Sequence, residues 1–294
     1  MWERSEAQMA GSCCYGCNGQ VFRRCGIATL SDLKTSEWGI LFTKLESVQS
    51  EFLAKEAEFR SPDYQWPSDS LHTWSRVWEY SYTYDFLFSW RKELGSAPVV
   101  ADVGSGVTFF PIAAARLGYT VVCTDIDPVC GQDLPRAARV VPHGPGTMSF
   151  RLMDSAKLPF EDEEVDALYC ISVLEHIPDF ENMIVEMARV LKPSGRLILT
   201  VDLDLNGKHE IGVERYLDLR TALRQCFDLA APEVTVHPAD QLTTINGPYP
   251  LRTLKGIDRF SFQVRQRIKP WFGRKPDSLM DYELCVAGFV LRRY

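Results

Sequence analysis

Hydrophobic and polar positions divide the chain into two parts with different periodicities. In residues 37–60, apolar side chains recur near helical spacing with charges between them, and residues 74–90 carry a dense set of aromatic side chains, so both segments predict helices. From Pro98 onward, short apolar runs alternate with helical patterns, which is typical of a parallel α/β sheet. The pattern therefore predicts an N-terminal helical cap over residues 1–97 and an α/β domain over residues 98–294.

Within the α/β part, the apolar runs predict strands, and the helical patterns between them have recognisable ends. Gly118 follows one helical pattern, at the position where glycine commonly ends helices. Asp179 precedes another, as an N-cap residue would. The predicted strands cover residues 99–103, 120–124, 148–153, 167–170, 196–201 and 283–291, with a short one near 233–237. Residues 238–282 have no clear core pattern and are too long for an ordinary connection, so they predict a lid insertion.

Charge and apolar runs exclude some classes of protein. The chain has 32 Lys and Arg residues against 39 Asp and Glu residues, a formal net charge of −7. Nucleic acid is therefore not the expected partner, because binding to phosphates needs an excess of basic residues. No apolar run approaches the roughly 20 residues of a transmembrane helix, and the first ten residues lack the apolar core of a signal peptide. We expect a cytoplasmic protein without membrane association.

The nine cysteines do not predict a disulfide framework, because their number is odd and they are spread along the chain. Cys13, Cys14, Cys17 and Cys25 lie close together. Only Cys14 and Cys17 have the spacing of a zinc-binding pair, and neither a second pair nor a nearby histidine follows. We predict no metal site, with zinc binding by this cluster kept as the alternative.

The strongest candidate for a ligand-binding loop is Asp102-Val103-Gly104-Ser105-Gly106, directly after the first predicted strand. A parallel strand that leads into a helix leaves free backbone N–H groups at its carboxyl end, and glycines let a ligand approach them closely. Dinucleotide-binding loops usually carry a third glycine, where this chain has Phe109. The carboxylate of Asp102 suits a cationic ligand better than a pyrophosphate. The loop therefore favours S-adenosylmethionine (AdoMet) over a nicotinamide dinucleotide.

Two further carboxylates follow the second and third predicted strands. Asp125, with Ile126 beside it, stands where a carboxylate can accept both hydrogen bonds of a ribose diol. Asp154 can accept a hydrogen bond from the exocyclic amine of adenine, and Ser155 offers a backbone N–H group to the ring. Each aspartate could instead cap a helix or hold a turn, although Asp127 is a better cap than Asp125. The order and spacing of the motifs favour a cofactor site.

Together these motifs resemble the class I AdoMet-dependent methyltransferases, in the branch of small-molecule methyltransferases. The resemblance implies a Rossmann-like α/β fold with seven strands in the order 3-2-1-4-5-7-6 and the last strand antiparallel. It also implies AdoMet as methyl donor and S-adenosylhomocysteine (AdoHcy) as product. The segments that match are VVADVGSG (99–106), VVCTDIDP (121–128), MDSAKLPF (153–160), VDALYCISVLEHIPD (165–179) and RVLKPSGRLIL (189–199).

The resemblance also assigns roles to residues. It implies that the Asp102–Gly106 loop cradles the methionine part, that Asp125 holds the ribose, and that Asp154 with Ser155 holds the adenine. Cys170 and Ile171 would line the sulfonium pocket. The segment Thr108-Phe109-Phe110 departs from the pattern, because many members are rich in glycine there.

A helix before the first strand often closes over the cofactor in this family. Arg76 could therefore pair with the AdoMet carboxylate, and Trp78 or Tyr80 could face the sulfonium, since a cation is attracted to an aromatic face. The alternative is that these aromatic side chains only attach the cap to the core.

Methyl transfer from a sulfonium needs mainly alignment of the nucleophile and exclusion of water, so no dedicated catalytic residue is required. The candidates for a proton acceptor are His176, His209 and Glu210. Some members of the family bind a metal through Glu-x-x-Glu-His, but here the first position is Ser172, so we predict no metal. A structural role for His176 is the alternative.

Residues 252–275 contain eight Lys and Arg residues and one acid, Asp258. This segment could contact an anionic acceptor or form a solvated surface. The leading hypothesis is methyl transfer to an O, N, S or C nucleophile of a small molecule, in specialised metabolism. The alternatives are a protein or RNA methyltransferase that docks through the basic segment, and an AdoMet-binding protein of the same fold without methyl transfer.

Overall fold

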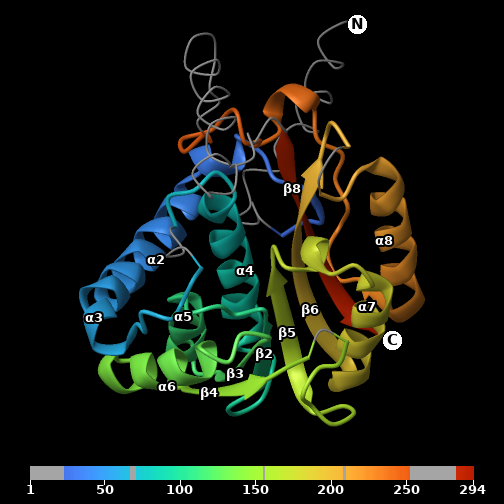
Figure 1. Ribbon diagram of the computed structural model, residues 1–294. Helices are drawn as coiled ribbons and strands as arrows, with labels where there is room; N and C mark the ends of the chain where they lie inside the picture. Colours follow the sequence, from blue (N-terminus) through green and yellow to red (C-terminus); the bar gives the residue numbers. More distant parts are fainter. Residues whose placement is uncertain (1–22, 67–70, 155, 208–209, 252–282) are drawn as a thin grey trace, which may run out of the picture.

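The computed structural model describes residues 23–66, 71–154, 156–207, 210–251 and 283–294. Its centre is a sheet with helices on both faces (Figure 1). The helices are α2 (Ser36–Ala54), α3 (Glu56–Phe59), α4 (Arg76–Trp90), α5 (Phe110–Arg116), α6 (Cys130–Val140), α7 (Phe180–Val190) and α8 (Val213–Cys226). In Figure 1, α2 to α6 lie on the left of the sheet, and α7 and α8 lie on the right. Within the described ranges, no helix is long and apolar enough to cross a membrane.

The sheet is close to the predicted one and has one additional strand. Its strands are β1 (Gly26–Ile27), β2 (Val99–Val103), β3 (Thr120–Asp125), β4 (Thr147–Leu152), β5 (Val165–Ile171), β6 (Leu191–Asp204), β7 (Phe227–Leu229) and β8 (Leu284–Arg293). They run in the order β4-β3-β2-β5-β6-β8, and both β7 and β1 pair with the outer side of β8. The first five of these strands are parallel and β8 is antiparallel to β6. The α/β fold and the antiparallel last strand are thereby confirmed, whereas the sheet order differs in detail from 3-2-1-4-5-7-6, because β1 also pairs with β8.

Both faces of the sheet are covered, which explains the nearly continuous apolar runs of β2, β3 and β5. Two hydrophobic clusters fill the spaces between the sheet and the helices on either side. Asp179 caps α7 as predicted, because its carboxylate accepts a hydrogen bond from the Asn182 backbone N–H at 3.2 Å.

Three elements differ from the sequence prediction. The sixth strand was expected near 233–237, but the chain forms β7 directly after α8. Residues 192–195, which lie before the strand predicted at 196–201, are part of β6, which pairs irregularly with β5 at this point. Helix α6 was not predicted, since Pro135 stands inside it and an interior proline disfavours a helix.

The cap does not have a core of its own. Helices α2, α3 and α4 confirm the helical prediction for residues 37–60 and 74–90, and their apolar side chains belong to the same cluster as one face of the sheet. Trp78 and Tyr82 of α4 lie against β8 at Gly288, where an added Cβ would come within 2.8 Å of both rings. The cap and the sheet therefore pack as one body in the described ranges.

Candidate functional site

The glycine loop lies where β2 ends and is joined to Asp125 at the end of β3. Gly104 and Gly106 have φ values of +72° and +51°, which favour glycine. The backbone N–H groups of Gly104 and Ser105 donate to the carbonyl of Thr124 at 2.9 and 3.0 Å. The N–H of Gly106 donates to Asp125 Oδ2 at 2.9 Å. The structure thus brings the first two sequence motifs together at one edge of the sheet.

Asp125 retains capacity for a ligand. Its Oδ1 accepts a hydrogen bond from the Asp127 N–H at 2.9 Å, so each oxygen has one partner among the described residues, and each can accept a second hydrogen bond. Ile126, next to it, has 59% of its surface exposed. Asp127 in turn accepts from the Val129 N–H at 2.9 Å and holds the turn before α6.

Asp102 and the end of β5 place their side chains on alternate faces of the sheet. The carboxylate of Asp102 is buried and accepts a hydrogen bond from the Tyr169 hydroxyl at 2.9 Å. Tyr169 and Ile171 pack with the cluster on the α4 side, whereas Cys170 is fully buried in the cluster on the α7 side. Since successive strand residues point to opposite faces, Ile171 and Asp102 share a face and Cys170 does not.

Asp154 has the turn role that was weighed against adenine binding. It is exposed, and its Oδ1 accepts hydrogen bonds from the N–H groups of Ala156 and Lys157 at 2.8 and 2.6 Å. Ser155 lies outside the described residues. A pocket of about 490 Å³ begins at Asp154 and follows the loop after β4, lined mainly by residues 151–154 and 157–161. Gly104 and Asp125 do not line it, so this pocket does not enclose the whole predicted cofactor site.

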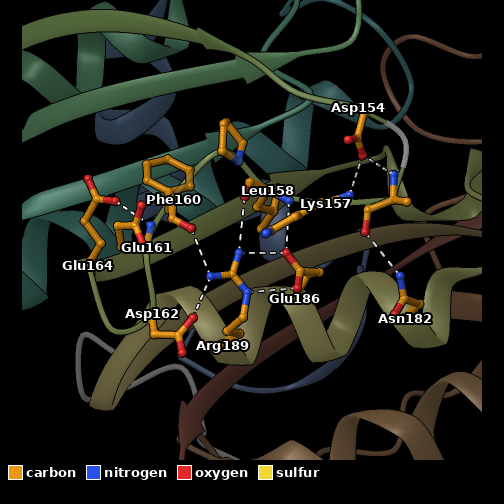
Figure 2. A network of polar contacts seen from close by, with 12 residues as sticks. Asp154, Lys157, Leu158, Phe160, Glu161, Asp162, Glu164, Asn182, Glu186 and Arg189 are labelled. Atoms are coloured by element: carbon orange, nitrogen blue, oxygen red, sulfur yellow. Dashed lines mark hydrogen bonds and ion pairs between the residues drawn. The ribbon is translucent and has the colours of Figure 1, made fainter.

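Helix α7 holds the loop after β4 (Figure 2). The Arg189 guanidinium donates to the carbonyl oxygens of Phe160 at 2.9 Å and Leu158 at 3.2 Å, and to Asp162 Oδ1 at 2.8 Å. It also forms two hydrogen bonds of 2.8 Å with Glu186. Glu186 accepts a hydrogen bond from the Leu158 N–H at 3.1 Å. The hydrogen bond from Arg189 lowers the pKa of Glu186 below its ordinary value, so this ion pair is a firm anchor for the loop.

The three candidates on α4 have different surroundings. Trp78 is fully buried, stacks on Tyr82 and donates from Nε1 to Asp32 Oδ2 at 2.8 Å. It attaches the cap to the core, which was the alternative, and its ring lies against Gly288 of β8, which pairs with Thr200 of β6. Arg76 is half-buried and pairs with Glu79 at 2.5 Å. The Arg76 guanidinium also lies over the ring of Tyr80, 5.7 Å from its centroid.

The packing of Tyr80 accounts for the two phenylalanines that follow the glycine loop, where many members of the family are rich in glycine. The buried ring of Tyr80 stacks on Phe110, with the centroids 4.8 Å apart, and contacts Phe109 edge-on at 5.2 Å. The two phenylalanines are therefore core residues that fasten the start of α5 to α4, and the glycine loop keeps its conformation without further glycines.

The sequence analysis missed two cap residues that contact the glycine loop. The Tyr64 hydroxyl accepts a hydrogen bond from the Val107 N–H at 2.9 Å, and Arg60 donates to the Val107 carbonyl at 3.1 Å. Burial raises the pKa of Tyr64 to about 12. These residues lie around Pro62, in a segment without periodicity, so only their polar and aromatic character could have marked them.

A group of buried carboxylates at the ends of β5 and β6 was also missed. Glu79 of α4 is fully buried, and its Oε1 accepts hydrogen bonds from the hydroxyls of Ser172 and Thr200, both at 2.6 Å. Glu175 lies in the 3-10 helix η3 (Leu174–His176) and accepts from the Asp202 N–H at 3.1 Å. The available signal was Glu79, one of two acids within the aromatic sequence of α4.

Of the three predicted proton acceptors, the structure describes two. The side chain of His176 is 62% exposed, and its Nδ1 lies 3.6 Å from Glu210 Oε2. His209 lies outside the described residues. Among the residues that are described, no group of three or more His, Cys, Asp or Glu side chains could hold a metal ion.

Other predictions fall only partly within the structure. Cys25 is buried, and the Val290 N–H donates to its Sγ at 3.3 Å, which gives this thiol a core position. Cys13, Cys14 and Cys17 lie outside the described residues, as do the basic residues of 252–275. The described part of the predicted lid, residues 238–251, begins with the 3-10 helix η4 (Pro238–Asp240).

Comparison with known proteins connects this geometry to a family. Residues 101–199 match the methyltransferase domain family. An uncharacterised methyltransferase of Mycobacterium marinum is 33% identical over 135 residues, which are 45% of this chain and 51% of the relative. Another, of Mycobacterium sp. strain JLS, is 34% identical over 133 residues, which are 44% of this chain and 50% of the relative. The chain thus spans about half the length of these curated relatives.

A solved structure extends the likeness to most of the chain. The 4+2 cyclase SpnF aligns with a TM-score of 0.50 at 18% identity, over 92% of this chain and 99% of SpnF. At this identity the likeness shows the fold alone.

Proposed function

Because residues 101–199 match the methyltransferase domain family, we propose that the protein binds AdoMet and transfers its methyl group to a small-molecule acceptor. The observation that carries the proposal is the hydrogen bond of 2.9 Å between the Gly106 N–H and the Asp125 carboxylate. This bond joins the glycine loop at the end of β2 to the Asp125 carboxylate at the end of β3, which can accept hydrogen bonds from a ribose diol. Open α/β sheets bind their ligands at such neighbouring strand ends. The setting in specialised metabolism stays a prediction.

The described residues fit AdoMet. Gly104 and Gly106 form a cradle without side chains, and Asp125 has free acceptor capacity for the ribose hydroxyls. Ile126 offers an exposed apolar surface beside Asp125, and Asp154 stands at the side expected for adenine. When bound, AdoMet supplies an electrophilic methyl group on a positively charged sulfur.

The residues of the chain then have three tasks. Arg60 and Tyr64 hold the glycine loop from the cap side, which fixes the cradle and excludes water from it. Arg76 offers a guanidinium for a carboxylate. His176 and Glu210 lie within 3.6 Å of each other and remain candidates for a proton acceptor at the edge of the site.

The second candidate function is AdoMet binding without methyl transfer. It is favoured by one observation, that the fold shared with the cyclase SpnF extends over 92% of the chain, cap included. The fold therefore does not by itself distinguish a methyltransferase from a protein with another activity.

Calorimetric titration with AdoMet and AdoHcy tests the proposal. We expect wild type to bind both, and Asp125→Ala to bind both at least about tenfold more weakly, because hydrogen bonds to a charged group are lost. Asp218→Ala, an exposed aspartate on α8, is the matched control and should bind as wild type does. Equal affinity of wild type and Asp125→Ala would contradict the proposed site.

Incubation with methyl-labelled AdoMet and separated metabolite, protein and RNA fractions then identifies the acceptor class. Label in the metabolite fraction supports the proposal. Label only in protein or RNA favours the macromolecular alternative, and AdoMet binding without label in any fraction favours the second candidate function.

A further inference from the structure

Four carboxylates gather beside the glycine loop, at the ends of β5 and β6. The connection to the loop is direct, because Val173 packs against Gly104 so closely that an added Cβ there would lie 2.5 Å from Val173 Cγ2. The Ser172 hydroxyl, one residue earlier, contacts two of the carboxylates, at 2.6 and 3.4 Å. We call this group the acid cluster, and its members are Glu79, Glu175, Asp202 and Glu210.

Glu79 and Glu175 of the acid cluster differ in the ion pairs and hydrogen bonds that their carboxylates receive. Glu79 receives an ion pair from Arg76 at 2.5 Å and two hydroxyl hydrogen bonds. Glu175 is only 3% exposed, and its Oε1 accepts from the Asp202 N–H, but its Oε2 is buried without a hydrogen-bond partner among the described residues. A buried carboxylate oxygen without a partner is unfavourable, so the position calls for a donor that the described chain does not provide.

The charges around Glu175 and Asp202 are mainly negative. Burial, followed by the nearby Asp202, raises the pKa of Glu175 well above its ordinary value. Burial, followed by the nearby Glu79, does the same to the pKa of Asp202, and Arg76 opposes this. Arg215 of α8 donates to the Glu175 carbonyl at 3.4 Å, not to its carboxylate. The other titratable groups that face the pair are the thiols of Cys170 and Cys285 and the carboxylate of Glu210.

We propose that Glu175 and Asp202 form the acceptor subsite of the enzyme and that the acceptor is an amine that arrives as an ammonium ion. The inference rests on the proposed function. An ammonium group donates hydrogen bonds and accepts none, so it can be the donor that Glu175 Oε2 lacks among the described residues, and its positive charge stabilises the ionised form of the pair. Asp202 is only half-buried, so the pair is not closed off from the protein surface. The same charges repel an anionic acceptor, which the basic residues 252–275 had suggested.

The subsite also supplies the proton acceptor that nitrogen methylation requires. The bound ammonium gives one proton to a carboxylate of the pair, which frees its lone pair. The lone pair forms the new N–C bond while the C–S bond of the donor breaks, and sulfur keeps the electrons of that bond. The products are the N-methylammonium ion and AdoHcy. In this scheme the buried pair takes the role predicted for His176, which is largely exposed.

Sinefungin tests the inference without knowledge of the acceptor. It is an AdoMet analogue with a protonated amine in place of the methyl sulfonium, so it carries an ammonium group to the point of transfer. We expect wild type to bind sinefungin at least about tenfold more tightly than AdoHcy at neutral pH, since a charge-assisted hydrogen bond is gained. Glu175→Gln, which can still accept from the Asp202 N–H, and Asp202→Asn should each lose most of this preference.

AdoHcy is the internal control, because it has no charge at the transfer point and its affinity should be unchanged in both variants. Glu214→Gln, an exposed acid at the start of α8, is the matched control variant and should keep the wild-type preference. The inference is overturned if wild type shows no preference for sinefungin over AdoHcy, or if the preference survives in Glu175→Gln and Asp202→Asn. In either case, AdoHcy binding by wild type would still support the proposed function. Failure of wild type to bind AdoHcy overturns the proposed function and this inference with it.

Discussion

Replacement of Arg189 by methionine should release the loop after β4 while leaving the rest of the fold intact. Methionine has a similar length and a high helix propensity, so α7 should persist. The change removes the hydrogen bonds to the carbonyls of Leu158 and Phe160 and leaves Glu186 without its ion-pair partner. The loop that begins with Asp154 would then be held mainly by the hydrogen bond from Arg151 to the Pro159 carbonyl at 2.9 Å and by the bond from the Leu158 N–H to Glu186 at 3.1 Å.

The magnitude follows from these contacts. A hydrogen bond that involves a charged group contributes about 1.5–3 kcal/mol. The bond to Leu158 is long, at 3.2 Å, and the Arg189 side chain is 23% exposed, so water replaces part of what is lost. We therefore expect local opening of the loop to become easier by about 2–3 kcal/mol, which corresponds to roughly 30- to 150-fold faster amide exchange.

Hydrogen exchange resolved along the chain measures this effect. Exchange should accelerate within residues 156–163 and remain near wild type in β2 and β5. Arg189→Lys should fall between the two proteins, because lysine keeps a charge for Glu186 but lacks the planar fork that reaches both carbonyls. Arg220→Met, which loses an ion pair with Glu233 and a contact with the Tyr216 ring on α8, is the control. Unchanged exchange in the loop, or equal acceleration throughout the sheet, would refute the view that Arg189 anchors this loop.

Two further predictions concern the cap. Trp78→Phe should lower the free energy of unfolding by about 1–3 kcal/mol in urea titrations, because Asp32 loses a buried donor. The affinity for AdoHcy should stay unchanged. A loss of affinity without a loss of stability would instead place Trp78 at the ligand. Since the pKa of Tyr64 is raised to about 12 in the folded state, the stability that depends on its protonated hydroxyl is fully present below pH 10 and is lost as the pH rises toward 12. The stability difference between wild type and Tyr64→Phe should therefore shrink above pH 10, and a constant difference between pH 8 and pH 11 would contradict this.

The sequence predicted the centre of the sheet well because its strands are covered on both faces. Under that condition apolar residues form short continuous runs, and β2 was predicted with its observed bounds. Strand β1 could not be predicted, since it has two residues and exists only through its pairing with β8. The position of β7 was predicted wrongly for a similar reason. This strand has only three residues, and its apolar pattern is no stronger than that of the adjacent sequence.

The sequence predicted those parts of the site that consist of short local motifs. It did not predict the parts that form only when distant segments of the chain pack together. Gly106 and Asp125 belong to motifs at the ends of adjacent strands, so the order of the sheet brings them together. Glu175 and Asp202 come from different elements, and their closeness depends on packing that no spacing reveals. Trp78 was ambiguous because α4 is buried on nearly every side, so its pattern does not tell which face meets the sheet.

The position of β8 has a consequence for how the chain is made. This strand fills the gap between β6 on one side and β7 and β1 on the other, yet it follows all three in sequence. During synthesis, β6 therefore presents an unpaired edge for as long as residues 284–293 have not emerged from the ribosome, and such an edge is a template for aggregation. The pairing of Gly26 with Gly288 also joins segments from opposite ends of the described chain, so closure of the sheet is a late, nonlocal and slow step. Nascent chains that stall before this strand should depend on chaperones more than the finished protein does.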